Sequence, residues 1–156
     1  MKKRRSYQRE KAEVKLWTFA EAERALPYVR SILQSLRENA LEVNRLELQR
    51  QRLAAKPGRP TRADLITLDN LQHEVQAATD RYHADLEELQ AFGVGCVDPI
   101  AGEAIFPFLY EQQVAWFLYN LFEGPHLRWW RFDTDSLNTR RPIYNDMKND
   151  NRLAVV

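Results

Sequence analysis

The residues best suited to bind a ligand form one aromatic and basic cluster near the C-terminal end of the chain. Its basic members are Arg128, Arg131, Arg140 and Arg141, and its other members are Trp129, Trp130, Asp133 and Asp135. Guanidinium forks hold carboxylates and phosphates through paired hydrogen bonds, and indole faces stack on guanidinium groups or on bases. The cluster therefore indicates a site for a small anion or a strand of nucleic acid. Internal ion pairs explain the same arginines without a ligand. Their partners would be Asp98, Glu123 or Asp133.

Aromatic residues are concentrated between positions 106 and 132, where ten of the chain's seventeen lie. They predict either the core of a small sheet or one wall of a ligand pocket. We expect such a pocket between the helical part of the chain and the aromatic strands. Its candidate residues are Trp116, Tyr119, Glu123, Trp129, Trp130, Arg131, Arg140 and Arg141.

Other arrangements that could support chemistry are weaker. Cys96 lies near Asp98, but nothing in the sequence places His126 beside the thiol to make it a thiolate, so we expect a buried, inert cysteine. His73 and His83 are separated by about 15 Å along one predicted helix and cannot share a metal. Phosphate-binding loops, dinucleotide fingerprints and the Gly-x-Ser-x-Gly motif are absent from the sequence. We therefore expect no metal and no cofactor.

Two long helices must position these residues. Apolar residues recur at steps of three and four along two stretches, which is typical of α-helices. The first stripe is Val29, Ile32, Leu33, Leu36, Ala40, Val43, Leu46 and Leu53, and the second is Leu65, Leu68, Leu71, Val75, Ala78, Tyr82, Leu86 and Leu89. The Pro/Gly segment 56–60 ends the first helix, and so short a connection predicts an antiparallel hairpin. Stripes this narrow resemble coiled-coil seams. They must be covered by the C-terminal module or by a second chain, which would complete a four-helix bundle.

The helix boundaries follow from local signals. Thr18 and Glu21 have the spacing of a capping box, and Trp17 stands where an apolar side chain can pack on the first turn. Pro27 predicts a short helix that ends at residue 25 or 26, then a bend; one continuous, kinked helix is the alternative. The second helix is expected from the cap-like Thr61 to residue 92, because Gly93 favours helix termination. The polar seam residues are Asn39, suited to fixing register, and Arg50, expected to extend to solvent.

The C-terminal module predicts strands rather than helices. Residues 104–110 indicate a strand, and Pro107 places it at a sheet edge. Residues 114–122 indicate a buried central strand, and residues 126–132 indicate a further strand. The predicted class is therefore α+β and mainly helical: a long antiparallel hairpin with a small antiparallel sheet of three or four strands packed on it.

Charge and composition divide the chain into three parts. Residues 1–15 carry a net charge of +5 and indicate a mobile basic arm, whereas the remainder carries −4. Residues 16–143 form one expected domain, divided into 16–92 (short helix and hairpin) and 93–143 (aromatic β module), and 144–156 are a polar tail. The single cysteine and the absence of any long apolar run favour a cytoplasmic protein without a membrane span.

The order of several short motifs resembles one known family. Those motifs are Leu16-Trp17-Thr18 with Glu21-Ala22 and Leu26-Pro27, then Gly95-Cys96-Val97-Asp98-Pro99, Trp116 to Glu123, Trp129-Trp130-Arg131 and Arg140-Arg141-Pro142-Ile143. Together they resemble the uncharacterised bacterial domain of unknown function 2203 family over residues 16–143. The resemblance implies this architecture and a bacterial cytosolic setting, and it carries no activity. The Cys and His that the family's motifs hold are replaced near Phe117–Tyr119 and at Arg131, so we expect no Cys/His chemistry here.

Three functional hypotheses follow. The first is a cytosolic interaction or scaffold protein of unknown specific role that forms a homodimer through its hairpin and acts on an unidentified protein partner. The second is a protein or enzyme that binds a small anion near Arg140 and Arg141. The third is nucleic-acid binding through the basic arm, by Lys2, Lys3, Arg4 and Arg5. The sequence does not identify a catalytic residue.

Overall fold

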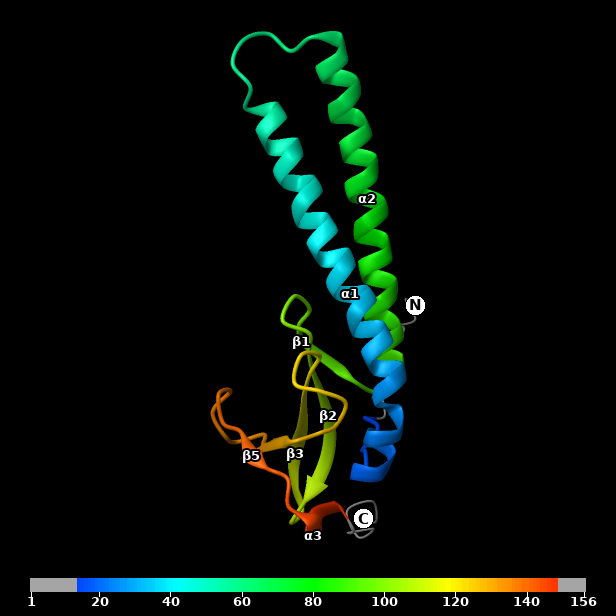
Figure 1. The fold of residues 1–156 in the computed structure, drawn as a ribbon, viewed down its shortest axis with the longest axis vertical. Helices are drawn as coiled ribbons and strands as arrows, with labels where there is room; N and C mark the ends of the chain where they lie inside the picture. Colours follow the sequence, from blue (N-terminus) through cyan, green and yellow to red (C-terminus); the bar gives the residue numbers. More distant parts are fainter. Residues whose placement is uncertain (1–13, 149–156) are drawn as a thin grey trace, which may run out of the picture.

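A computed structural model describes residues 14–148 of the chain. Its elements are α1 (Phe19–Ala54), α2 (Arg62–Ala91), β1 (Gly95–Asp98), β2 (Glu103–Tyr110), β3 (Gln113–Asn120), β4 (Trp129–Phe132), β5 (Arg141–Pro142) and α3 (Asn145–Lys148). Figure 1 shows a long helical hairpin with a small antiparallel sheet packed against its lower half. The predicted α+β class is therefore confirmed. None of the described helices is long and apolar enough to cross a bilayer.

Both long helices begin at the expected caps. The Thr18 hydroxyl accepts a hydrogen bond from the Glu21 amide, and Thr61 forms a complete capping box with Asp64. The predicted break before Pro27 is wrong, and the continuous alternative is correct, because α1 passes through this residue. Proline removes one amide donor from the helix. The buried neighbours on either side of it pack into one common core, and this packing outweighs the lost bond.

A polar cluster locks the two helices in register near the middle of the hairpin. The Asp85 carboxylate accepts hydrogen bonds from Ser35 Oγ at 2.6 Å and from Asn39 Nδ2 at 2.8 Å. Arg81 Nε donates to Asn39 Oδ1 at 3.4 Å. A one-turn slip would break all of these bonds, which agrees with the register role expected of Asn39. Arg50 instead pairs with a glutamate on its own helix, as expected for a side chain that extends to solvent.

The sheet has five strands in the order β1-β2-β3-β4-β5, one more than the largest number predicted. The sequence did not predict β1 or β5, which are four and two residues long. The assignment of β2 to a sheet edge is also wrong, because β2 lies between β1 and β3. Pro107 is tolerated there because β1 pairs only with residues 103–105. Beyond β1, the main-chain carbonyl of Pro107 accepts a 2.8 Å hydrogen bond from the Trp17 amide.

The main core lies between the sheet and the lower half of the hairpin. Phe108 and Phe117 stack at a centroid distance of 3.9 Å, and Trp130 meets Phe108 edge-on at 6.0 Å. These rings pack with buried residues of α1 and α2 in one continuous cluster. Seven of the ten clustered aromatic residues belong to this core or pack against it, as one of the two sequence interpretations expected, whereas Trp116, Phe122 and Trp129 do not.

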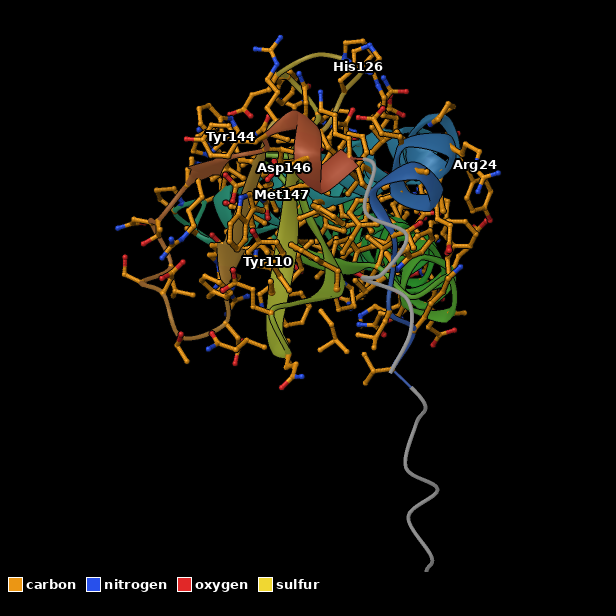
Figure 2. The ribbon with its side chains drawn as sticks, turned by 90° about the horizontal axis from the view of Figure 1, so that it is seen from below. Arg24, Tyr110, His126, Tyr144, Asp146 and Met147 are labelled. Carbon is orange, nitrogen blue, oxygen red and sulfur yellow. The ribbon has the colours of Figure 1, made fainter. Side chains whose placement is uncertain are left out.

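Residues just outside both predicted ends of the domain pack against it. Met147 of α3 is only 3% exposed and belongs to the main core, so the expected polar tail contributes to packing. Figure 2 shows α3 across the lower end of the structure, where Met147 joins the core against which Tyr110 also packs. At the other end, the Lys15 ammonium lies 3.8 Å from the centroid of the Trp17 ring. The four arm residues proposed to bind nucleic acid lie outside the described residues.

The distal half of the hairpin projects beyond the sheet (Figure 1). Its own small core consists of Leu46, Leu71, Val75 and Ala78. Val43 and Leu53 pack against this cluster and remain partly exposed. Among residues 14–148, this small core is built from the two long helices.

Candidate functional site

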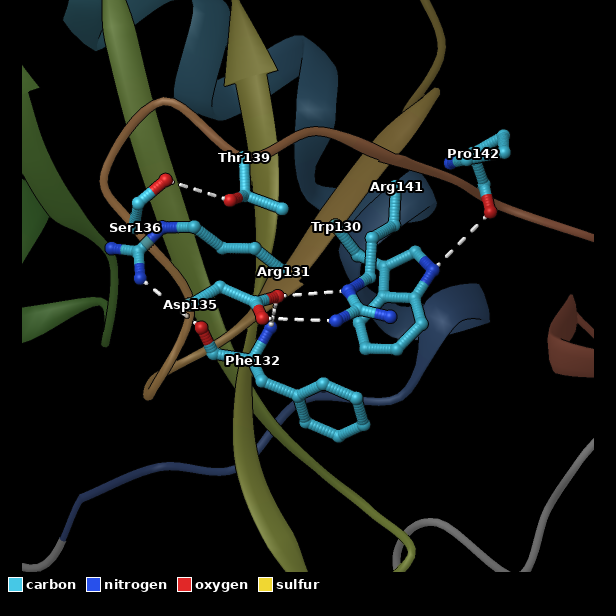
Figure 3. Close-up of polar contacts among 8 residues, drawn as sticks. All are labelled: Trp130, Arg131, Phe132, Asp135, Ser136, Thr139, Arg141 and Pro142. Atoms are coloured by element: carbon cyan, nitrogen blue, oxygen red, sulfur yellow. Dashed lines mark hydrogen bonds and ion pairs between the residues drawn. The ribbon is translucent and has the colours of Figure 1, made fainter.

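A loop of residues 133–140 joins β4 to β5 and is tied to the sheet by polar contacts. Asp135 is the centre of these contacts, since its carboxylate receives the Phe132 amide at 2.9 Å and both Nε and Nη2 of Arg141 at 2.8 and 2.9 Å. Figure 3 shows this arrangement, together with the bond between the hydroxyl groups of Ser136 and Thr139. The loop is therefore positioned by interactions within the chain.

Electrostatics agree with this geometry. The hydrogen bond from Arg141 is the largest cause of the lowered pKa of Asp135, and the same bond raises the pKa of Arg141. The Arg141 guanidinium also lies 4.9 Å from the Phe132 ring centroid and 5.4 Å from that of Trp130. Both contacts keep Arg141 at the side of the sheet that faces the hairpin. An internal ion pair thus accounts for Arg141, with Asp135 in place of the expected acids.

The opposite face of the sheet carries a cavity of about 90 Å³. Arg131 lines this cavity and is only 8% exposed. Arg140 lines it as well and lies 3.6 Å from a carboxylate oxygen of Glu103. Apolar side chains complete the wall: Val97, Ile105, Leu118 and Leu137. The cavity therefore combines two guanidinium groups, one carboxylate and a hydrocarbon lining.

The predicted site residues are divided between the two faces of the sheet. Trp130 and Tyr119 are buried in the core toward the hairpin, where Trp130 Nε1 donates to the Pro142 carbonyl and the Tyr119 hydroxyl donates to the Gly124 carbonyl. Burial is the largest cause of the raised pKa of Tyr119. Core side chains fill the space between the hairpin and the sheet, where we expected a pocket. The arginine-lined cavity lies on the other face of the sheet.

The remaining candidates lie on the outer face or in turns. Strand alternation places Trp116 and Trp129 on the face of Arg131. Trp116 Nε1 donates to an Asp133 carboxylate oxygen at 3.0 Å, which helps to fix the loop. Glu123 lies in the turn that follows β3. Of the predicted site residues, Arg131, Arg140 and Tyr119 line the cavity, whereas Trp130 and Arg141 lie on the face toward the hairpin. Sequence reasoning missed Glu103, Ile105 and Leu137, whose place in the wall depends on strand pairing and loop closure.

The other chemical candidates are held apart. Burial raises the pKa of the Cys96 thiol to about 11, so this group is protonated at neutral pH. His126 lies 3.1 Å from a Glu23 carboxylate oxygen on α1 and His73 lies beside Asp69. Within residues 14–148, no group of three or more His, Cys, Asp or Glu side chains is arranged to hold a metal ion.

A second hollow lies where the hairpin leaves the sheet. It has a volume of about 340 Å³ and is lined by both long helices and by the turn between β1 and β2. Val43, Tyr82 and Ile100 contribute apolar surface to it. Arg37 Nε donates to the Ile100 carbonyl at 2.8 Å and thereby fixes the turn against α1. We call this hollow the hairpin groove.

Comparison with known families gives one match. Residues 15–143 match the family described as uncharacterized conserved protein, DUF2203. The chain belongs to this family. The matched range covers the hairpin and all five strands. Searches of curated proteins and of solved structures gave no match.

Proposed function

We propose that this DUF2203 protein acts by association, and that its distal hairpin binds the hairpin of a second copy of the chain. The observation that carries this proposal is the exposure of large apolar side chains beyond the sheet. Leu41 and Leu48 on α1 are 38% and 47% exposed, and Leu65 and Ile66 on α2 are 55% and 52% exposed. Exposed apolar surface of this kind marks interaction sites in proteins.

The spacing of these residues suits another helix as the partner. Leu41 and Leu48 are seven residues apart and therefore lie on one side of α1. The charges beside them are paired along the same helix, since Arg45 bonds Glu42 and Arg50 bonds Glu47. The apolar stripe is thus flanked by charges that are already paired within one helix. Such a surface can pack against an identical surface that is related to it by a two-fold axis.

The β module leaves room for such a partner. Val43 and Leu53 are only partly buried by the two helices of one chain, and Val43 also lines the hairpin groove together with Ile100. Two hairpins packed in this way would form a four-helix bundle, in which these side chains become core. The alternative of a different protein partner would use the same surface.

Native mass spectrometry and sedimentation velocity across a range of concentrations test the proposal. We expect a dimer in the wild type and a monomer in the double variant Leu41→Glu/Leu48→Glu, because a four-helix core cannot bury four carboxylates without partners. Leu137→Glu is the matched control, since Leu137 is 85% exposed on the far side of the sheet, and we expect it to remain dimeric. A wild type that is monomeric at every concentration, or a double variant that is as dimeric as the control, would overturn the proposal.

A further inference from the structure

Arg131 carries a buried charge that the described part of the chain does not neutralise. Its side chain is 8% exposed, and its one hydrogen bond runs from Nη1 to the Phe132 carbonyl at 3.2 Å. The remaining guanidinium nitrogens donate to no residue in the range 14–148, and no carboxylate there lies within ion-pair distance. Asp135, whose pKa Arg131 helps to lower, is already bound by Arg141 and by a main-chain amide. A buried arginine of this kind needs an anion.

The unused donors of Arg131 meet the outer-face cavity. Figure 3 shows the Arg131 side chain running away from Trp130, beneath the loop that carries Ser136 and Thr139. Among the described residues, no completely buried side-chain nitrogen lacks a hydrogen-bond partner. The nitrogens of Arg131 that have no partner are therefore accessible to solvent. They reach it through the cavity that Arg131 lines. Arg140 adds a second positive charge to the same wall, against one negative charge from Glu103. The excess of one positive charge selects an anion.

The size and lining of the cavity select the class of anion. A volume of about 90 Å³ is far below the pockets of about 300–1,000 Å³ that hold larger ligands. Ile105, Leu118 and Leu137 supply hydrocarbon surface that a bare inorganic ion would not use. A guanidinium fork matches the two oxygens of a carboxylate.

We propose that this cavity binds a short aliphatic carboxylate. The carboxylate lies on the free nitrogens of Arg131, Arg140 adds long-range attraction, and the hydrocarbon tail contacts Ile105 and Leu118. The site is on the opposite face of the sheet from the main core and is independent of association through the hairpin.

Titration of the full chain with propionate, followed by the Nε–Hε resonance of Arg131 in ¹H–¹⁵N NMR spectra, tests the proposal directly. We expect a saturable shift of this resonance, a smaller response to the bulky 2,2-dimethylpropanoate ion, and only a linear change with chloride at equal ionic strength. A propionate response that is linear and equal to that of chloride would overturn the site. Saturation by inorganic phosphate with no saturation by propionate would overturn the carboxylate class.

Three variants separate ligand binding from a structural role. Arg131→Met removes the fork while keeping the length of the side chain, and we expect at least tenfold weaker propionate binding. Glu103→Gln removes the competing carboxylate, and we expect binding that is several-fold tighter than in the wild type. Arg24→Met is the matched control, because Arg24 is an exposed arginine on α1 (Figure 2), and its affinity should equal that of the wild type. An unchanged affinity in Arg131→Met, or a weaker one in Glu103→Gln, would contradict the proposal; each affinity is read from NMR shifts of neighbouring amides.

Discussion

The hairpin contains two cores of different construction, and truncation of one leucine in each should cost different amounts of free energy. Leu33 is completely buried in the main core, between helices and sheet. Leu46 is only 2% exposed, but its neighbours belong to the two helices alone, and Val43 and Leu53 beside it are partly open to solvent. The two side chains thus have similar burial and different surroundings.

The expected loss of unfolding free energy depends on whether the surrounding side chains can fill the cavity that each truncation leaves. Leucine to alanine removes three carbon atoms, which is about 2.4 kcal/mol at roughly 0.8 kcal/mol each. In the distal hairpin the long side chains at the surface can fold over the gap, so Leu46→Ala should cost close to this value. Leu33→Ala leaves a cavity enclosed by sheet and helices, and the cavity term brings its cost to about 4–5 kcal/mol.

Urea unfolding monitored by far-UV circular dichroism measures both costs. The two truncations should be made in the Leu41→Glu/Leu48→Glu background at low protein concentration, so that association does not contribute. We expect Leu33→Ala to lower the free energy of unfolding by about 2 kcal/mol more than Leu46→Ala. Equal costs for the two variants, with unchanged denaturant slopes, would refute the view that the distal core is open.

Further predictions concern the hairpin register, the turns and the thiol. Asn39→Leu should lower the free energy of unfolding in urea by about 1–3 kcal/mol, because the Asp85 carboxylate loses its 2.8 Å amide donor; a neutral result would contradict the register role. Gly102→Ala should cost about 2–4 kcal/mol, since a Cβ atom at φ +71° would lie 2.6 Å from a leucine side chain, whereas Gly58→Ala at φ +90° meets no atom within 4 Å and should cost about 1 kcal/mol. Equal losses of unfolding free energy for these two glycine variants in the same urea assay would contradict this prediction, because they would show that backbone conformation alone matters. Reaction of Cys96 with a disulfide reagent should accelerate about tenfold per pH unit up to about pH 11, because only the thiolate attacks and burial disfavours it; a rate that levels off near pH 8 would show an unperturbed thiol.

Elements specified by local sequence were predicted well. The caps at Thr18 and Thr61, the end of α2 at Gly93 and the Pro/Gly connection all appear where the sequence places them. Capping and termination depend on residues a few positions apart, so they are visible without the fold. Pro27 is the exception, because burial of its neighbours in the main core overrides a local preference.

The sheet was predicted less completely, since short strands are defined by their partners. β1 and β5 are too short to show alternation, and each exists because a longer strand offers it hydrogen bonds. Met147 was likewise placed in a polar tail, although α3 packs this single apolar residue into the core. No local pattern distinguishes such a segment from a solvated terminus.

The helical hairpin, the aromatic character of the module and the arginines near its end can all be read from the amino-acid sequence. These properties depend on residue type and on short-range periodicity. The three-dimensional fold is needed to bring Arg131 and Arg140 to one cavity with Glu103 and to turn Arg141 to the other face, where it pairs with Asp135. Adjacent residues of a strand point to opposite faces, and only the closure of the loop over one face determines which guanidinium groups meet.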